Sequence, residues 1–375
     1  MIPYGRQSIN ENDIEAVIDA LQSDFLTTGP LVEKFESQLA NKVGAPTTVV
    51  SSGTAALHCA YAAIEIKPGD EIITPPITFI ATQATAAIMG AKIVFADVQQ
   101  DTANIDPTAV EAAITPQTKA IVAVDYAGHP ADMDELRTIA DKYEIYLIED
   151  AAHSIGSIYK GRPVGSLADI TTFSFFPTKN LTTAEGGAIS ALDSELLDRA
   201  RLFSRQGLIR DFSKFKISDQ GSWHQEVHNF GLNYRLPDVL CALGLSQLQR
   251  LAEFKIKRNE IFQAYTEAFA EIENLTLPGK RDYVDPTWHL FPIRVPAEKR
   301  KSVFDQLRAA GIGVQVNYLP AYLHPVFGSE QYPTGLCPIA EKFYSEEISL
   351  PIHFGLSIGD IDKIAKSLIH SLGCK

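Results

Sequence analysis

The chain of 375 residues is poor in cysteine and has no excess of positive charge. Its four cysteines, Cys59, Cys241, Cys337 and Cys374, lie far apart, and no two of them form a C-x-x-C pair. This spacing argues against a disulfide framework and predicts free thiols in a reducing cytosol. Lysine and arginine number 33 against 46 aspartates and glutamates, a formal net charge of -13. Nucleic-acid binders usually show the opposite balance, so we expect no nucleic-acid partner.

Long apolar runs are also missing. No uninterrupted apolar stretch approaches the roughly 18 residues that a membrane-spanning helix needs. The first residues, MIPYGRQSINENDIEAV, lack the basic start and apolar core of a signal peptide. Both observations predict a cytoplasmic protein with no membrane partner. Hydrophobic residues at 45% and charged residues at 21% are ordinary for a globular enzyme, and the length suggests two domains.

Strand-like and helix-like segments alternate through the first half of the chain. The β-branched stretch TTVV leads into the alanine-rich SSGTAALHCAYAAI, and EIIT leads into FIATQATAAIMG. Strands that alternate with helices predict an α/β fold, with a mostly parallel sheet and helices on both faces. Ligands of such sheets bind beyond the carboxyl ends of the strands. The further elements expected are strands at 91–98, 120–128, 145–150 and 171–176, and helices at 106–114 and 133–143.

The second half is organised differently. A polar and aromatic stretch, 205–231, predicts a long functional loop, and residues 239–272 predict a long helix that connects two domains. We expect a large domain with an N-terminal arm at 1–250 and a smaller α/β domain at 251–375. The elements expected in the smaller domain are a strand at 290–295, a helix at 301–312 and a strand at 313–320.

Two strand ends carry side chains that together suggest one chemistry. Asp150 closes the apolar stretch IYLIED, and Lys179 follows the stretch TTFSFF within FSFFPTKNLTTAEGGA. A lysine amine forms a Schiff base with the aldehyde of pyridoxal 5'-phosphate (PLP), and a carboxylate keeps the pyridine nitrogen of PLP protonated. Each residue alone has an ordinary explanation, since most lysines are solvated and an aspartate often closes a turn. The pair is more informative than either residue.

Flanking residues fit the same chemistry. The stretch SSGTAAL follows a predicted strand and opens a helix, where backbone N–H groups and the helix dipole attract a phosphate. Phe79 follows another strand, where its ring could stack on a cofactor or simply belong to the core. Ser174 lies five positions before Lys179 and could add a hydroxyl to the phosphate site.

Taken together, these motifs resemble the DegT/DnrJ/EryC1/StrS family of sugar-nucleotide aminotransferases, over nearly the whole chain. The motifs EDAAHSIGSIYKGRPVG and FSFFPTKNLTTAEGGA are specific as a pair, and SSGTAALH, DEIITPPITFIAT and GLNYRLPDVLCALGLSQL agree with them. The resemblance implies the aspartate aminotransferase-like fold, PLP-dependent fold type I. It also implies a homodimer with shared active sites. Some dehydratases of this superfamily have His in place of the lysine, so the presence of Lys179 favours amino transfer over deoxygenation.

The resemblance also implies a role for single residues. Lys179 and Asp150 would be catalytic, as the Schiff-base lysine and the partner of the pyridinium nitrogen. The other cofactor-binding residues implied are Phe79 on the ring, His153 near the ring oxygen, Thr54, Ala55 and Ser174 on the phosphate, and Asn233 on the phosphate of the neighbouring subunit's cofactor. From the residues alone, His153 could also be a hydrogen-bonded core histidine, and Asn233 reads as a surface or turn amide that only the resemblance makes a ligand.

Within the family, the chain is most similar to the enzymes of the pseudaminic acid pathway, in stretches such as YGRQSINENDI and FYSEEISLPIH. This similarity implies transfer of an amino group from L-glutamate to C4 of a UDP-linked 2-acetamido-2,6-dideoxy-4-ketohexose. The sequence departs from the family at Phe176, Asn317 and Leu319, where relatives commonly have His, His and Lys. The substrate contacts expected are Arg205, Arg210 and Arg235 on the diphosphate, and Tyr4, Tyr318 and Tyr322 on the sugar or uracil.

Other functions fit the sequence less well. The match to G-x-S-x-G at 355–359 leaves no room for the later acid and histidine of a hydrolase. No G-x-G-x-x-G follows the first strand, as a nicotinamide dehydrogenase would require, and no metal site is predicted. An aminotransferase for a different keto sugar, and a sugar-nucleotide sensor without catalysis, remain as alternatives.

Overall fold

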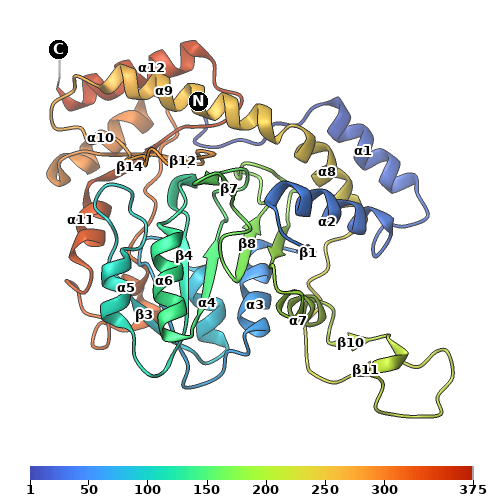
Figure 1. Ribbon diagram of the computed structural model, residues 1–375. Coiled ribbons are helices and arrows are strands. Elements are labelled where there is room, and N and C mark those ends of the chain that lie inside the picture. Colours follow the sequence, from blue (N-terminus) through green and yellow to red (C-terminus); the bar gives the residue numbers. More distant parts are fainter. Residues whose placement is uncertain (374–375) are drawn as a thin grey trace.

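The computed structural model describes residues 1–373, and its centre is a seven-stranded sheet (Figure 1). The strand order is β1 (Thr47–Val50), β9 (Gly187–Ser190), β8 (Ile170–Ser174), β5 (Tyr146–Asp150), β4 (Thr118–Val124), β2 (Glu71–Thr74) and β3 (Lys92–Phe95). Strand β9 runs antiparallel to β1 and β8, and the remaining neighbours in the sheet pair in parallel. The mostly parallel α/β sheet predicted from the sequence is confirmed.

Both faces of the sheet are apolar, as expected for parallel strands that helices cover on both sides. On one face Ile72, Val122 and Ile148 pack in a cluster with side chains of α3 (Gly53–Ala63) and α7 (Ser194–Ser204). On the other face Ile121 and Leu147 pack with side chains of α2 (Pro30–Val43), α6 (Met133–Tyr143) and α8 (Asp238–Gln249). The remaining helices of this part are α1 (Glu11–Gln22), α4 (Ala81–Ile88) and α5 (Pro107–Ala113).

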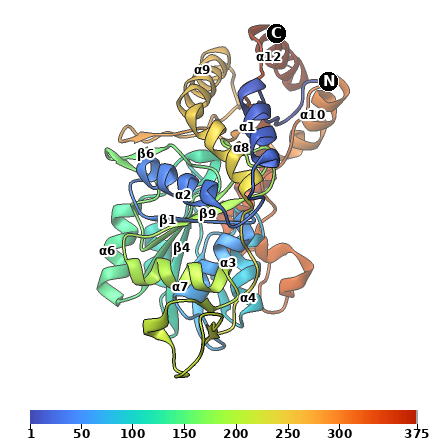
Figure 2. The ribbon, with the colours of Figure 1, turned by 90° about the vertical axis from the view of Figure 1, so that its right-hand side faces the viewer.

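The C-terminal part packs beside the sheet as a smaller α/β unit. Its helices are α9 (Leu251–Phe269), α10 (Ala297–Ala309), α11 (Pro338–Glu346) and α12 (Ile358–Leu372). Its two-stranded sheet pairs β13 (Phe291–Arg294) with β14 (Glu347–Leu350). The first residues of the chain lie against this part, because Ile2 bridges to Ile312. Figure 2 accordingly shows the N-terminus near α10 and α12.

Two expectations for the second half are wrong in detail. The predicted helix at 239–272 consists of two helices, α8 and α9, that meet at Arg250. Residues 313–320 form no regular strand, and Gln315 makes only an isolated bridge to Ser349. The partner of β13 is instead β14, which follows α11.

The predicted functional loop at 205–231 projects from the body of the molecule (Figure 1). It contains a short hairpin of β10 (Leu208–Ile209) and β11 (Glu226–Val227). The other short strands are β6 (Ile158–Tyr159), β7 (Arg162–Pro163) and β12 (Val284–Asp285), which form a separate three-stranded sheet. We call residues 205–231 the arm.

Within residues 1–373, no helix is long and apolar enough to cross a membrane. The cysteines Cys59, Cys241 and Cys337 are free and buried, and burial raises the pKa of the Cys59 thiol to about 12. Cys374 lies outside the described residues. The cytoplasmic location stays a prediction.

Candidate active site

A cavity of about 510 Å³ opens where β5, β8 and β1 end, at the boundary with the C-terminal part. The registers place Val50 and Ser174 opposite the same residue of β9, and Asp150 beside Val124 of β4, so these strands end at one edge of the sheet. Sites for small ligands and cofactors usually measure about 300–1,000 Å³. The position is the one expected for a ligand of a parallel sheet.

Asp150 lies in the floor of this cavity and is 5% exposed. The Thr82 hydroxyl donates to Oδ2 at 2.8 Å, and the Ala152 N–H donates to Oδ1 at 3.2 Å. Burial raises the pKa of Asp150, whereas these two hydrogen bonds and the charge of Lys179 lower it. The donors hold the carboxylate in one orientation, in which it can accept a further N–H from a ligand.

Lys179 lines the same cavity, in the turn after β8. Its amine makes no hydrogen bond or ion pair with any residue among 1–373, which leaves it free for a ligand. Burial lowers the pKa of Lys179 to about 8, and the charge of Asp150 opposes this shift. A larger fraction of the amine is therefore neutral near pH 7–8 than for a solvated lysine, and the neutral amine is the nucleophile.

The start of α3 also lines the cavity and forms a cradle for an anion. The Ser52 hydroxyl caps the helix by accepting the Ala55 N–H at 3.0 Å, while the N–H groups of Gly53 and Thr54 have no acceptor among the described residues. Ser174 approaches so closely that a Cβ on Gly53 would lie 2.8 Å from the Ser174 Cβ. Two free N–H groups, a helix N-terminus and a serine hydroxyl suit a phosphate.

Two histidines and a tyrosine that line the cavity lie close together. The rings of His153 and His289 lie 4.3 Å apart, and the Tyr318 hydroxyl lies 3.3 Å from His153 Nε2. Burial lowers the pKa of both histidines, and the charge of Lys179 adds to this effect. Phe79 also lines the cavity, is 60% exposed, and has its ring 6.3 Å from that of Tyr318.

The structure brings together eight of the residues singled out from the sequence. The residues that line the cavity are Tyr4, Thr54, Phe79, Asp150, His153, Ser174, Lys179 and Tyr318. Six others lie elsewhere. Ala55 is buried and does not line the cavity, and the Tyr322 hydroxyl donates to Glu341 at 2.5 Å, away from the cavity. The remaining residues, Asn233, Arg205, Arg210 and Arg235, lie in or beside the arm.

Sequence reasoning missed several lining residues. Thr82, which orients Asp150, lies on α4 and is separated from Asp150 by 68 positions, so no local motif links the two. His289 gives no local signal either. Phe176, one of the departures from the family, lines the cavity and is 46% exposed. Of the two other departures from the family, Asn317 lines the cavity.

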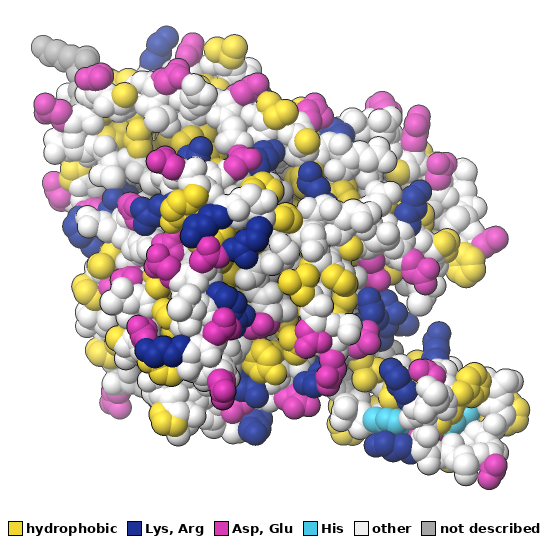
Figure 3. Space-filling view, in the orientation of Figure 1, with side chains coloured by type: hydrophobic (Ala, Val, Ile, Leu, Met, Phe, Trp, Pro, Cys, Tyr) yellow, Lys and Arg dark blue, Asp and Glu magenta, His cyan; other side chains and the backbone are white. Residues whose placement is uncertain are grey.

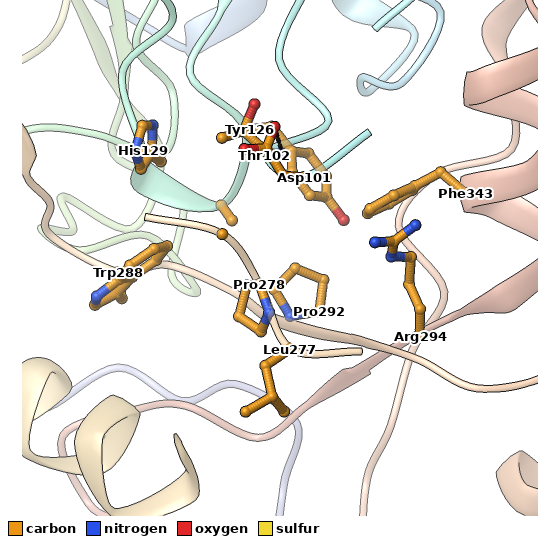
Figure 4. Close-up of a pocket in the computed structure, with 12 residues that line it drawn as sticks. Asp101, Thr102, Tyr126, His129, Leu277, Pro278, Trp288, Pro292, Arg294 and Phe343 are labelled. Atoms are coloured by element: carbon orange, nitrogen blue, oxygen red, sulfur yellow. Dashed lines mark hydrogen bonds between the residues drawn. The ribbon is translucent and has the colours of Figure 1, made fainter. Parts of the chain in front are cut away.

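The residues present fit PLP. The cradle at α3 matches its phosphate, Asp150 its ring nitrogen, and the free amine of Lys179 its aldehyde. Another hollow, between Asp101, Tyr126 and Arg294, has a volume of about 10 Å³ (Figure 4). That space admits about one water molecule, so it cannot hold a cofactor or a sugar nucleotide. A lysine opposite a buried carboxylate, beside a phosphate cradle at the strand ends, defines a PLP enzyme of fold type I.

Comparison with known proteins narrows this class. The DegT/DnrJ/EryC1/StrS aminotransferase family matches residues 7–369. The chain is 38% identical to the spore coat polysaccharide biosynthesis protein SpsC of Bacillus subtilis, over 98% of the chain and 96% of SpsC. It is also 38% identical to a UDP-4-amino-4,6-dideoxy-N-acetyl-beta-L-altrosamine transaminase of Campylobacter jejuni, over 99% of the chain and 97% of that protein.

Solved structures agree with these relatives. Spr1654 of Streptococcus pneumoniae, in its PMP form, superposes with a TM-score of 0.94 at 32% identity, covering 100% of the chain and 99% of Spr1654. PseC of Helicobacter pylori, an aminotransferase of pseudoaminic acid biosynthesis, superposes with a TM-score of 0.92 at 33% identity, covering 99% of each chain. The protein belongs to the DegT/DnrJ/EryC1/StrS aminotransferase family and is a PLP-dependent sugar aminotransferase.

Proposed function

We propose that the protein transfers an amino group from L-glutamate to C4 of a UDP-linked 2-acetamido-2,6-dideoxy-4-ketohexose. The product would be UDP-4-amino-4,6-dideoxy-N-acetyl-β-L-altrosamine. The observation that carries amino transfer is the free amine of Lys179 beside the buried carboxylate of Asp150. The identity of the sugar is inferred from the names of the Campylobacter and Helicobacter relatives. It is also inferred from the stretches near both ends of the chain that are similar to enzymes of the pseudaminic acid pathway.

Each residue then has a defined task. PLP supplies an electron sink that makes the proton next to nitrogen removable. Lys179 would hold the cofactor through Nζ and, once released, carry a proton between the cofactor and C4 of the sugar. Asp150, held by Thr82 and Ala152, would keep the ring nitrogen protonated. His153 would face the ring oxygen, and Phe79 would stack on the ring.

The substrates carry more negative charge than one chain can balance in this cavity. Among the lining residues that the structure describes, Lys179 is the one lysine or arginine, and Glu185 and Asp150 are acidic. A sugar nucleotide adds a diphosphate and glutamate adds two carboxylates. Cationic partners for these groups therefore come most simply from a second copy of the chain.

The arm offers such partners. It carries Arg210, and Arg205 and Arg235 lie at its base, where Arg235 Nε donates to Asn233 Oδ1 at 3.0 Å. Its apolar side chains are unusually exposed for a monomer, with Trp223 at 78% and Phe230 at 97%. Figure 3 shows apolar and basic side chains together on this projection. We propose a homodimer in which Asn233 and these arginines complete the neighbouring active site.

The test of the sugar assignment is a comparison of two C5 epimers. The L-arabino 4-keto sugar carries its methyl group on the face opposite to that of the D-xylo isomer, so a cavity shaped for one clashes with the other. We expect a higher kcat/KM for UDP-2-acetamido-2,6-dideoxy-β-L-arabino-hex-4-ulose than for its D-xylo epimer, with L-glutamate as donor. Mass detection of the amino product provides the readout.

The opposite preference would reject this sugar and leave amino transfer in place. A different keto sugar is the second candidate, and one observation favours it. Asn317, which departs from the family, lines the cavity, so the sugar pocket is not identical to that of relatives with His at this position. Screening a panel of nucleotide-linked 4-ketohexoses with the same readout covers that outcome.

A further inference from the structure

A buried hydrogen-bond chain ends on the Tyr4 hydroxyl at the cavity. It begins at Glu347, the first residue of β14, which is 0% exposed and has no lysine, arginine or histidine within ion-pair distance among the described residues. Ser349 Oγ and Glu347 Oε1 share a hydrogen bond, and the Asn317 N–H donates to Glu347 Oε2 at 2.7 Å. Glu347 therefore fixes both the Ser349 hydroxyl and the backbone of Asn317.

Asn317 is held at three further points. The Tyr126 hydroxyl donates to its carbonyl oxygen at 2.6 Å. Its side-chain Nδ2 donates to Ser349 Oγ at 3.0 Å, and the serine oxygen can accept this bond whichever way its own proton points. The second Nδ2 hydrogen goes to the Tyr4 hydroxyl oxygen at 2.6 Å. Asn317 is 6% exposed, so this amide has little freedom to rotate.

The direction of the hydrogen bond between Asn317 and Tyr4 decides what the Tyr4 hydroxyl can do. Its oxygen accepts from Asn317, and its own proton has no acceptor among the described residues. Tyr4 lines the cavity. We propose that Asn317, anchored by Glu347 and Ser349, turns the Tyr4 hydroxyl into a dedicated hydrogen-bond donor to an acceptor oxygen of the substrate. Tyr4 would then select for an unprotonated oxygen, and Asn317 would be the positioning residue that sets this selectivity.

The ligand oxygen has two possible sources, a carbonyl of the keto sugar and a carboxylate of the amino donor. The inference rests on the proposed function, because both sources are its substrates. The two half-reactions, amino donor with the PLP form and keto sugar with the PMP form, separate the sources. Binding of UDP-N-acetylglucosamine, measured by calorimetry, adds a readout that does not require turnover.

Two variants test the hydrogen bond from the Tyr4 hydroxyl to the substrate, one by removing the donor and one by redirecting its proton. Tyr4→Phe removes the donor. Asn317→Asp replaces the Nδ2 donor by an acceptor oxygen, toward which the Tyr4 proton would turn, away from the substrate. Each variant should lower kcat/KM roughly three- to tenfold in the same half-reaction, the usual effect of one lost hydrogen bond. The double variant should lose no more than either single variant, since both remove the same bond.

The matched control is Tyr332→Phe, which also removes one hydroxyl, but one that donates to the Ile93 carbonyl at 2.8 Å outside the cavity. It should keep both half-reactions at the wild-type level. If Asn317→Asp does not fold, as judged by its melting temperature, Asn317→Leu keeps the shape and removes the anchor of Tyr4. It should likewise lower the affected half-reaction.

Wild-type rates for Tyr4→Phe in both half-reactions would overturn the inference. Wild-type rates for the folded Asn317 variant beside a slow Tyr4→Phe would overturn the positioning role. A wild-type protein that aminates no nucleotide-linked keto sugar, while Tyr4→Phe and the Asn317 variant still weaken UDP-N-acetylglucosamine binding, would reject the proposed function and leave the inference standing.

Discussion

Burial in one cavity favours the neutral forms of both Lys179 and Asp150. Loss of solvation lowers the pKa of Lys179 to about 8 and raises that of Asp150, while attraction between the two charges opposes both shifts. The balance leaves a lysine that is reactive near neutral pH beside a carboxylate that its hydrogen bonds help to keep ionised. These two residues were the strongest candidates from the sequence, and the fold brings them to the same cavity.

The first prediction concerns the pH at which apo protein captures PLP. Only the neutral amine attacks an aldehyde, so the capture rate should rise with pH and level off above about 8, the pKa of Lys179. Stopped-flow absorbance of added PLP measures this rate. Lys179→Ala should abolish the covalent signal, and Lys160→Ala, an exposed lysine paired with Asp134, should keep the profile.

The pH dependence of PLP capture should also change in the variant Asp150→Asn. The charge of Asp150 raises the pKa of Lys179, so its removal should move the capture profile to lower pH. Turnover should fall by orders of magnitude because the ring nitrogen loses its anionic partner. A midpoint near that of an ordinary solvated lysine in the wild type, or an unmoved profile in Asp150→Asn, would contradict this electrostatic account.

The second prediction concerns Glu347 and stability. Burial raises its pKa to about 8, so the folded protein holds this proton at pH values where an unfolded chain has released it. Between the ordinary glutamate pKa and about 8, the folded state binds more protons, and the free energy of unfolding falls as pH rises. This single group accounts for at most about 1.4 kcal/mol per pH unit.

Glu347→Gln removes the titration. The difference in unfolding free energy between Glu347→Gln and wild type, from urea melts at several pH values, should move in favour of the variant up to about pH 8 and then stay constant. Taking the difference cancels the other titrating groups. A difference that does not change with pH would show that Glu347 has an ordinary pKa.

At the scale of elements, the phosphate cradle depends on how closely α3 approaches β8. A methyl group at Gly53 would lie 2.8 Å from the Ser174 Cβ, too close for the present backbone. The third prediction is that Gly53→Ala weakens PLP binding by at least tenfold, because the helix start must move away from Ser174. Equilibrium dialysis of PLP measures the change.

Gly359→Ala provides the control for this substitution. Its added Cβ would lie 3.8 Å from Ser357 Oγ, an ordinary contact, and alanine suits the first turn of α12. It should bind PLP as the wild type does. Equal PLP affinity for Gly53→Ala and wild type would mean that α3 does not hold the phosphate.

Elements with a local cause were predictable from the sequence. Strand β5 begins with the apolar residues 146–148, and α5 begins with Pro107 after the capping residue Asp106, so both elements have a local signal in the sequence. Residues 313–320 have a strand-like pattern, but Asn317 bonds to the side chain of Glu347, 30 positions away, and no regular strand forms. The break between α8 and α9 lies at Arg250, whose guanidinium contacts Asp13 and Ser8 near the start of the chain.

The residues of the site also divide into those with a local signal in the sequence and those placed by distant contacts. Lys179, Asp150 and the start of α3 each lie at a strand end that the sequence marks, so their convergence follows from a parallel sheet. Thr82, His289 and the chain from Glu347 to Tyr4 reach the cavity only through tertiary packing, and their sequence neighbours give no sign of it.

At the scale of the whole molecule, a single chain has two features that suggest a partner. Its cavity has too little positive charge for the substrates, and the apolar side chains of its arm are exposed. Asn233, which the family resemblance assigns to the neighbour's phosphate, is exposed and does not line the cavity of its own chain. Both facts agree with a dimer whose arms exchange contacts. Arg205 also forms an ion pair with Glu36 of its own chain, with Nη2 3.6 Å from Oε1, which anchors the base of the arm.

The last prediction tests this exchange by complementation. Lys179→Ala inactivates the site in which it lies, whereas Asn233→Ala, under the dimer proposal, damages the site of the partner. In a heterodimer of the two variants, one site therefore has both defects and the other has neither, so co-refolded mixtures should recover activity that neither parent shows. If half of the dimers are mixed, each with one intact site, about a quarter of the wild-type activity returns.

Lys179→Ala mixed with Asp150→Ala should recover nothing, since both residues belong to the same chain's cavity. Mass spectrometry of the intact dimers confirms that mixing occurred, and mixed dimers without activity would place Asn233 outside the shared site.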